Sequence, residues 1–97
     1  MSKHRRAAKV DNNQGEIVKA LRQIPGVTVE TSHDDILVGY RGITYWFEIK
    51  TEDTVGVDGN VRESAKKDSQ KMLEAEWRGH YRIVWKVEQI LIDLGIS

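Results

Sequence analysis

A chain of 97 residues has room for one folded domain, and its composition, 39% hydrophobic and 31% charged, is that of an ordinary globular protein. The absence of cysteine excludes disulfide bonds and thiolate metal sites, and no apolar run approaches the ~20 residues needed to span a bilayer. The N-terminus also lacks the apolar stretch of a signal peptide, so we expect an intracellular, cytoplasmic protein with no membrane partner.

The net charge is zero, but the charges are unevenly distributed along the chain. Residues 1–10 hold no acid and four bases, namely Lys3, Arg5, Arg6 and Lys9. Subtracting these four from the fifteen bases of the chain leaves eleven bases against fifteen acids in residues 11–97. A basic arm therefore precedes a single, mildly acidic domain, and the arm is either a solvated terminus or a segment that binds phosphate.

The first predicted element is a helix in residues 11–24. Asp11 and Gln14 have the spacing of a capping box, and the helix ends before Pro25-Gly26. The residues that share its apolar face are Ile17, Ala20, Leu21 and Ile24.

Three predicted strands follow, because residues 27–31, 35–40 and 43–50 are rich in β-branched and aromatic side chains. Only Arg41-Gly42 separates the last two strands, which predicts a tight antiparallel hairpin.

The second half of the domain begins with a segment rich in Gly, Asp, Asn and Thr, residues 51–64, which predicts a long loop or a small hairpin around Asp58-Gly59. A helix in 64–79, a strand in 81–85 and a closing helix in 87–95 come next. The side chains predicted to face inward from the closing helix are Val87, Ile90, Leu91 and Leu94. The element order αβββαβα predicts an α/β fold with a mixed sheet flanked by helices.

The two-residue turn fixes which residues of the hairpin face each other. If Tyr40 faces Ile43, then Asp35 lies directly opposite Glu48, on the same side of the sheet and with Cβ atoms roughly 5 Å apart. Like charges in this position repel, and a hard divalent cation such as Mg²⁺ or Mn²⁺ would remove the conflict.

This pair of carboxylates defines a candidate metal site. The backbone carbonyl of Ile49 is a possible third ligand, and Lys50 shares the face of Glu48, where its ammonium could orient an attacking water or stabilise charge that develops on a phosphate. The chemistry implied is phosphodiester hydrolysis. Spacing alone equally allows a surface hairpin whose charged residues form an exposed ion pair worth only ~0 to 1 kcal/mol.

Asp35 followed by Glu48-Ile49-Lys50 on the next strand resembles the PD-(D/E)XK motif of the restriction-endonuclease-like superfamily, with Asp34 where that motif usually has proline. The segments DILVGYRGITYWFEIKT and DSQKMLEAEWRGHYRIVWKVEQIL, together with Glu16 in the preceding helix, resemble the virus-type replication and repair nuclease (VRR-NUC) family across nearly the whole chain past residue 11. The resemblance implies a restriction-endonuclease-like core in which Glu16 assists the metal site and Gln70 approaches it.

The same resemblance implies a substrate and an assembly. Small stand-alone members of the family, found in phages and bacteria, are similar to Holliday-junction resolvases that act as homodimers on branched DNA, whereas relatives within larger repair proteins cut flaps. A chain of this length is similar to the first kind. The expectation is an endonuclease that uses Mg²⁺ or Mn²⁺, with two open alternatives: a DNA-binding module without catalysis, and a nuclease that prefers flaps or duplexes.

Several other residues have both a structural and a functional interpretation. Three further bases are either a solvated face or phosphate contacts beside the metal site: Lys66, Lys67 and Lys71. Trp46 shares the face of Glu48, Trp77 and Trp85 are interpreted as core or dimer-interface residues, and His80 as a residue at a helix end.

Overall fold

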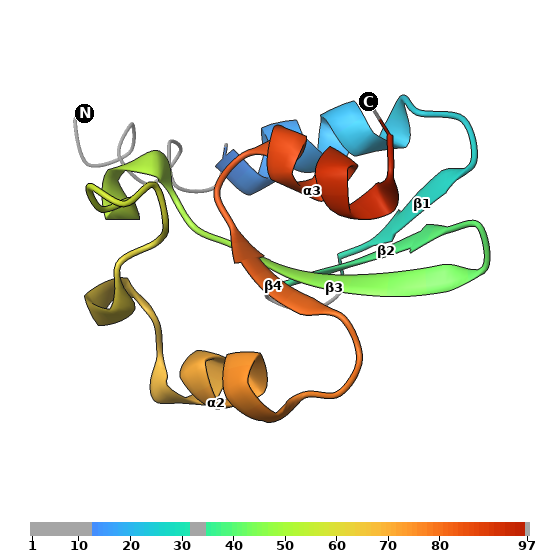
Figure 1. Cartoon of the computed structure of the whole chain (residues 1–97). Helices are drawn as coiled ribbons and strands as arrows, with labels where there is room; N and C mark the ends of the chain where they lie inside the picture. The colour runs from blue at the N-terminus through green and yellow to red at the C-terminus, as the bar shows by residue number, and fades with distance from the viewer. Residues whose placement is uncertain (1–12, 32–34, 97) are drawn as a thin grey trace.

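A computed structural model describes residues 13–31 and 35–96 of the chain. The described elements are a helix through residues 13–22, β1 (Val27–Glu30), β2 (Ile36–Tyr40), β3 (Ile43–Ile49), the 3₁₀ turns η1 (Glu52–Thr54) and η2 (Glu63–Ala65), α2 (Asp68–Glu76), β4 (Tyr81–Val84) and α3 (Val87–Leu94). The predicted α/β order is confirmed (Figure 1). No helix in the described ranges is long and apolar enough to cross a membrane.

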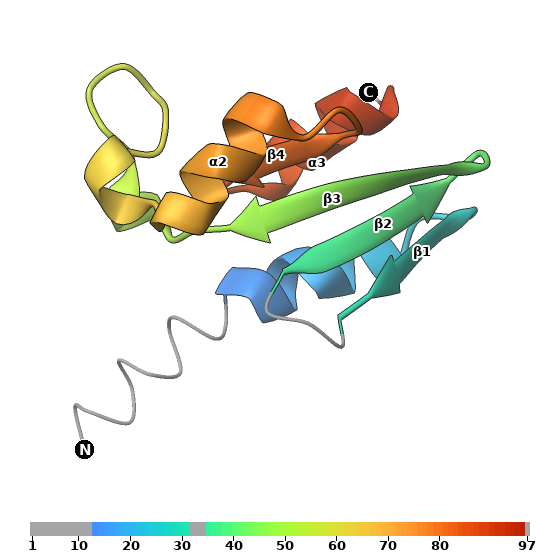
Figure 2. The same cartoon turned by 90° about the horizontal axis from the view of Figure 1, so that it is seen from below.

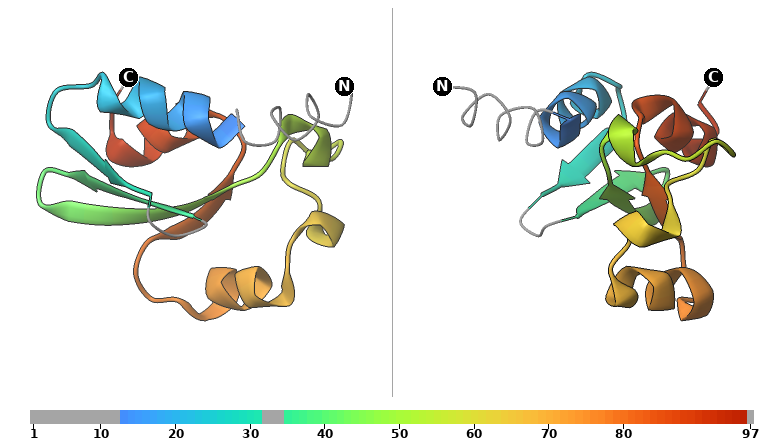
Figure 3. Two further views of the ribbon diagram at one scale, coloured as in Figure 1. Left: turned by 180° about the vertical axis from the view of Figure 1, so that it is seen from behind. Right: turned by 90° about the vertical axis from the view of Figure 1, so that its left-hand side faces the viewer.

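The four strands form one mixed sheet in the order β1-β2-β3-β4. The first three strands are antiparallel neighbours, and β4 pairs in parallel with β3 after the crossover through α2. The helix of residues 13–22 and α3 cover one face of the sheet, while α2 lies on the other (Figures 2 and 3). This arrangement is consistent with a restriction-endonuclease-like core.

The β2–β3 hairpin has the predicted two-residue connection. Arg41 and Gly42 both have positive φ, 53° and 80°, the combination of a type I′ turn, whose twist matches that of the flanking strands. Tyr40 consequently pairs with Ile43, and the register continues without a bulge to Ile36 and Phe47. The predicted register is confirmed.

The hydrophobic core lies between the sheet and the helices of one face. Alternate residues of the hairpin enter it, and Ile36, Val38 and Phe47 are fully buried. The inward face predicted for α3 is confirmed, with Ile90 and Leu94 buried and the two other predicted residues packed against the core.

One prediction for the first helix is wrong. Ala20 is exposed, and Val18 is buried instead, beside Ile17 and Leu21. The buried stripe therefore follows positions i, i+1 and i+4, and it puts the larger side chain of Val18, rather than the methyl group of Ala20, against the sheet.

The connection between β3 and α2 contains the small hairpin expected as one of two alternatives. Val55 and Val61 form an antiparallel bridge around the turn that contains Asp58-Gly59. The predicted start of the following helix at Ser64 is wrong, because η2 ends and the backbone is extended at Lys67 before α2 begins at Asp68. The side chain of Gln70 caps this start by accepting a hydrogen bond from the Lys67 amide at 2.9 Å.

Candidate active site

Residues of the sheet that do not enter the core face α2 across a cavity of about 860 Å³. Its lining comes from the two hairpin strands, β4, α2 and the residues that flank these elements. It consists of Asp35, Leu37, Trp46, Glu48, Lys50, Lys67, Ser69, Gln70, Leu73 and Tyr81. Four residues predicted from the sequence, Asp35, Glu48, Lys50 and Gln70, are thus brought together, although they come from three separate segments of the chain.

The two carboxylates lie where the hairpin register puts them. Ile36 pairs with Phe47, so Asp35 and Glu48 are the next facing positions, and both residues are partly buried. The indole N–H of Trp46 donates a hydrogen bond to Oδ2 of Asp35. This contact holds one carboxylate in place and leaves its second oxygen for other partners.

Lys50 lies beside Glu48 in the cavity wall. Its Nζ is 4.0 Å from Oε2 of Glu48, and the two side chains are only 16% and 15% exposed. The backbone is held from two sides, because the Lys50 N–H donates to the Val84 carbonyl at 2.8 Å and its carbonyl accepts from Nδ2 of Asn13 at 2.6 Å. Asn13 thereby ties the first helix to the end of β3, a contact that the sequence pattern did not predict.

The carbonyl of Ile49, predicted as a third metal ligand, points away from β4. In a trans peptide the carbonyl of one residue points opposite to the N–H of the next, and the N–H of Lys50 points at β4. The Ile49 carbonyl is therefore directed to the side of β3 on which β2 and its preceding residue Asp35 lie.

Gln70 and Glu16, the two supporting residues implied by the family resemblance, have different positions. Gln70 is buried, at 7% exposure, and lines the cavity while its oxygen caps α2. Glu16 is exposed on the first helix and does not line the cavity.

The acidic residues present fit a hard divalent cation. Between residues 13–31 and 35–96, no group of three or more Asp, Glu, His or Cys side chains could hold a metal ion. The carboxylates that line this cavity are those of Asp35 and Glu48. Mg²⁺ is commonly bound in this way, through one or two carboxylates while it keeps several of its waters. The oxygen donors and the small number of ligands therefore suit Mg²⁺ or Mn²⁺ better than a softer metal.

Tyr81 is a cavity residue that the sequence analysis missed. It opens β4 and pairs with Trp46 of β3, whose ring it contacts edge-on at a centroid distance of 5.0 Å. Burial raises its pKa well above the usual range, and the negative charges of Glu48, Asp35 and Glu74 raise it further. Its hydroxyl thus keeps its proton beside the two carboxylates.

His80 does more than follow a helix end, which corrects the interpretation from the sequence. Its Nδ1 accepts a hydrogen bond from the Trp46 amide at 3.2 Å, and its Nε2 lies 2.8 Å from Oδ2 of Asp93 on α3. The imidazole of His80 therefore links β3 to α3 at Trp46, the residue whose indole donates to Asp35. Trp77, predicted as core or interface, is 51% exposed and contacts Trp46 edge-on.

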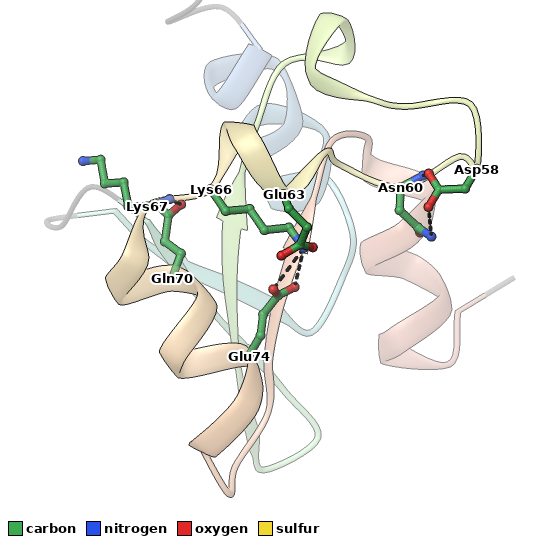
Figure 4. A network of polar contacts seen from close by, with 7 residues as sticks. All are labelled: Asp58, Asn60, Glu63, Lys66, Lys67, Gln70 and Glu74. Atoms are coloured by element: carbon green, nitrogen blue, oxygen red, sulfur yellow. Dashed lines mark hydrogen bonds and ion pairs between the residues drawn. The ribbon is translucent and has the colours of Figure 1, made fainter.

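Of the predicted phosphate-binding bases, Lys66 is engaged within the fold. Its Nζ lies 2.7 Å from Oε2 of Glu63 and 3.0 Å from Oε1 of Glu74, and its side chain is only 9% exposed (Figure 4). This cluster borders a second cavity of about 860 Å³ under the small hairpin. Lys67 and Lys71 are exposed, with Lys67 at the edge of the carboxylate cavity. The basic arm, Asp11 and Asp34 lie outside the described residues.

Lys66→Met is expected to lower the free energy of unfolding by about 1 kcal/mol at neutral pH, because it leaves Glu63 and Glu74 close together without a cation. Burial opposes the charge of Lys66, but the hydrogen bonds to both glutamates outweigh burial and raise its pKa above 10.5. The hydrogen bond from Lys66 lowers the pKa of Glu63 below 4.5.

These opposite shifts define the pH window of the effect. The contribution of Lys66 is complete below 10.5 and is lost as the pH rises through its raised folded-state pKa. The contribution of Glu63 is complete above 4.5 and is lost as the pH falls through its lowered pKa. Urea denaturation across the pH range should show the deficit of the variant between these limits and its disappearance outside them. Lys71→Met, on an exposed residue, is the control, and an equal stability of both variants would remove the assigned role of Lys66.

Compared with known proteins, the chain matches no family model, no curated protein and no solved structure. The candidate site therefore rests on the geometry of its own residues.

Proposed function

We propose that the protein is a divalent-metal-dependent endonuclease of the VRR-NUC kind, which hydrolyses phosphodiester bonds in branched DNA such as Holliday junctions and acts as a homodimer with Mg²⁺ or Mn²⁺. The observation that carries the proposal is the convergence of Asp35, Glu48 and Lys50 on one cavity. A carboxylate pair with an adjacent ammonium is a combination suited to phosphoryl chemistry.

In this proposal, Asp35, Glu48 and the Ile49 carbonyl would hold the cation. Such a cation would supply positive charge that polarises the phosphate and makes an attacking water more acidic. The Lys50 ammonium, 4.0 Å from the Glu48 carboxylate, orients the attacking water and stabilises the negative charge that develops on the phosphate oxygens. Hydrogen bonds from both sides fix the backbone of Lys50 and so keep its ammonium group in the cavity wall.

The flanking residues support the same substrate class. Gln70 presents a buried carboxamide to the cavity, and Lys67, just before α2, and Lys71, in its first half, place two exposed cations there for contact with the DNA backbone. The basic arm, Lys3 to Lys9, adds non-specific affinity. Preference for junctions follows from the family resemblance and from symmetry, because a two-fold dimer presents one active site to each of two opposed strands.

The proposal predicts cleavage that needs a divalent cation and Lys50. Purified protein is incubated with labelled four-way junction, splayed-arm, flap and linear duplex DNA in Mn²⁺, Mg²⁺ or EDTA. We expect cutting in Mn²⁺ and Mg²⁺, none in EDTA, and a rate for Lys50→Ala that is lower by about 10²-fold or more, since removal of one charge-stabilising donor commonly has this effect. Lys19→Ala, on an exposed lysine of the first helix, should cut like the wild type.

The outcomes separate the functional classes. Preferred cutting of the four-way junction supports a resolvase, and preferred cutting of flaps or duplexes keeps the nuclease while replacing its substrate. Salt-dependent DNA binding that is indifferent to EDTA and to Lys50→Ala, with no cutting in any metal, would leave a DNA-binding module without catalysis.

A further inference from the structure

Tyr81 carries a polar group that the fold itself does not satisfy. Its hydroxyl is buried and has no hydrogen-bond partner in the described part of the chain. Most buried hydroxyl groups are paired, and an exception calls for an explanation such as a functional role or a missing ligand. The position of Tyr81 in the wall of the carboxylate cavity indicates a functional one.

The sheet register puts Tyr81 next to Glu48. Tyr81 pairs with Trp46 across the parallel β3–β4 ladder, and Glu48 is two residues further along β3, on the same face. Tyr81 and Glu48 also line the same cavity. A tyrosine hydroxyl that keeps its proton can donate one hydrogen bond, and Asp35 and Glu48 are the carboxylate acceptors in the same cavity wall.

The other carboxylate, that of Asp35, has a donor of this kind. The Trp46 indole donates to Oδ2 of Asp35, which fixes the orientation of that carboxylate. Carboxylates that hold a metal ion are usually oriented by a hydrogen bond of this kind to an oxygen not engaged by the ion. Tyr81 lies in edge contact with Trp46, so the unsatisfied hydroxyl belongs to the ring next to the one that holds Asp35.

We propose that Tyr81 is a positioning residue whose hydroxyl donates a hydrogen bond to the carboxylate of Glu48 when a divalent cation is bound. The inference rests on the proposed metal site and adds to it the residue that orients Glu48. Because the hydroxyl is buried behind the cavity surface, it acts through Glu48 and not by direct contact with DNA.

The test compares Tyr81→Phe, which removes only the hydroxyl, with wild type and with Tyr40→Phe at the far end of β2. Mn²⁺ affinity is measured by isothermal titration calorimetry, and thermal unfolding is followed without metal. We expect Tyr81→Phe to bind Mn²⁺ about tenfold more weakly, in line with the loss of other partners of metal ligands. Its melting temperature without metal should not fall, because the hydroxyl makes no bond there that could be lost. Tyr40→Phe should bind Mn²⁺ like the wild type.

Two results would overturn the inference while the metal site stands: wild-type Mn²⁺ affinity of Tyr81→Phe, or a clear loss of its stability without metal, which would assign the hydroxyl to internal packing. If wild type itself binds no Mn²⁺, the proposed function fails, and the inference falls with it. If wild type binds Mn²⁺ but cuts no DNA, the nuclease proposal alone fails, because the comparison of Mn²⁺ affinities still decides the role of Tyr81.

Discussion

Asp35→Asn is expected to reduce metal-dependent DNA cleavage by about 10³-fold and to weaken Mn²⁺ binding while the fold stays intact. Asparagine has nearly the same shape, and its amide oxygen can still accept the hydrogen bond from the Trp46 indole. What the substitution removes is one of the two negative charges in the cavity, and a metal ion supplies several kcal/mol of stabilisation to the transition state. The loss should therefore appear in chemistry and in metal affinity together.

The measurements are single-turnover cleavage of four-way junction DNA in Mn²⁺, calorimetric titration with Mn²⁺, and thermal unfolding. Asp53→Asn is the matched control, because this aspartate is exposed in η1 and does not line the cavity. Full cleavage by Asp35→Asn would show that Asp35 holds no ion and would remove the basis of the proposed site. A loss of cleavage accompanied by unfolding would instead make Asp35 a structural residue.

Phe47→Ala is expected to lower the free energy of unfolding by about 3 to 5 kcal/mol, the usual range for truncation of a buried phenylalanine. Phe47 is fully buried at the centre of β3, and its ring contacts those of Tyr45 and His80. A domain of this size has a total stability of roughly 5 to 15 kcal/mol, so the substitution removes a large part of it.

Urea denaturation followed by circular dichroism measures this loss. Ile43→Ala is the control on the same strand, since Ile43 is 53% exposed and its truncation should change the stability by less than about 1 kcal/mol. A loss of less than about 1 kcal/mol, well below the typical range, would contradict the assignment of Phe47 to the hydrophobic core.

The hairpin and its carboxylates could be predicted because a two-residue turn fixes a register by local geometry. Once Arg41-Gly42 was recognised as the turn, counting along both strands placed Asp35 opposite Glu48, and alternation placed Lys50 on the same face. The elements themselves were also predictable, since their periodicity reflects burial on one side of the sheet.

Tyr81 and His80 were not found because their roles depend on contacts between distant segments. A parallel strand that returns through α2 has no turn that fixes its register, so the pairing of Tyr81 with Trp46 could not be counted out. The link from His80 to Asp93 likewise depends on how α3 packs. Ala20 was predicted to be buried, but Val18 is buried in its place. A stripe of small and large apolar residues does not by itself define the centre of the buried face of a helix.

The way α2 is attached has a consequence for how the two halves of the site hold together. In α2 the buried side chain is the polar one of Gln70, whereas α3 buries the apolar side chains of Ile90 and Leu94. Little apolar surface thus anchors α2, and an element held in this way opens locally at a lower free energy than the rest of a domain. The carboxylates belong to the sheet, while Gln70 and Lys71 belong to the helix that buries less apolar surface. In the proposed nuclease, an outward movement of α2 would widen the cavity for a DNA strand while Asp35 and Glu48 stay in place on the sheet.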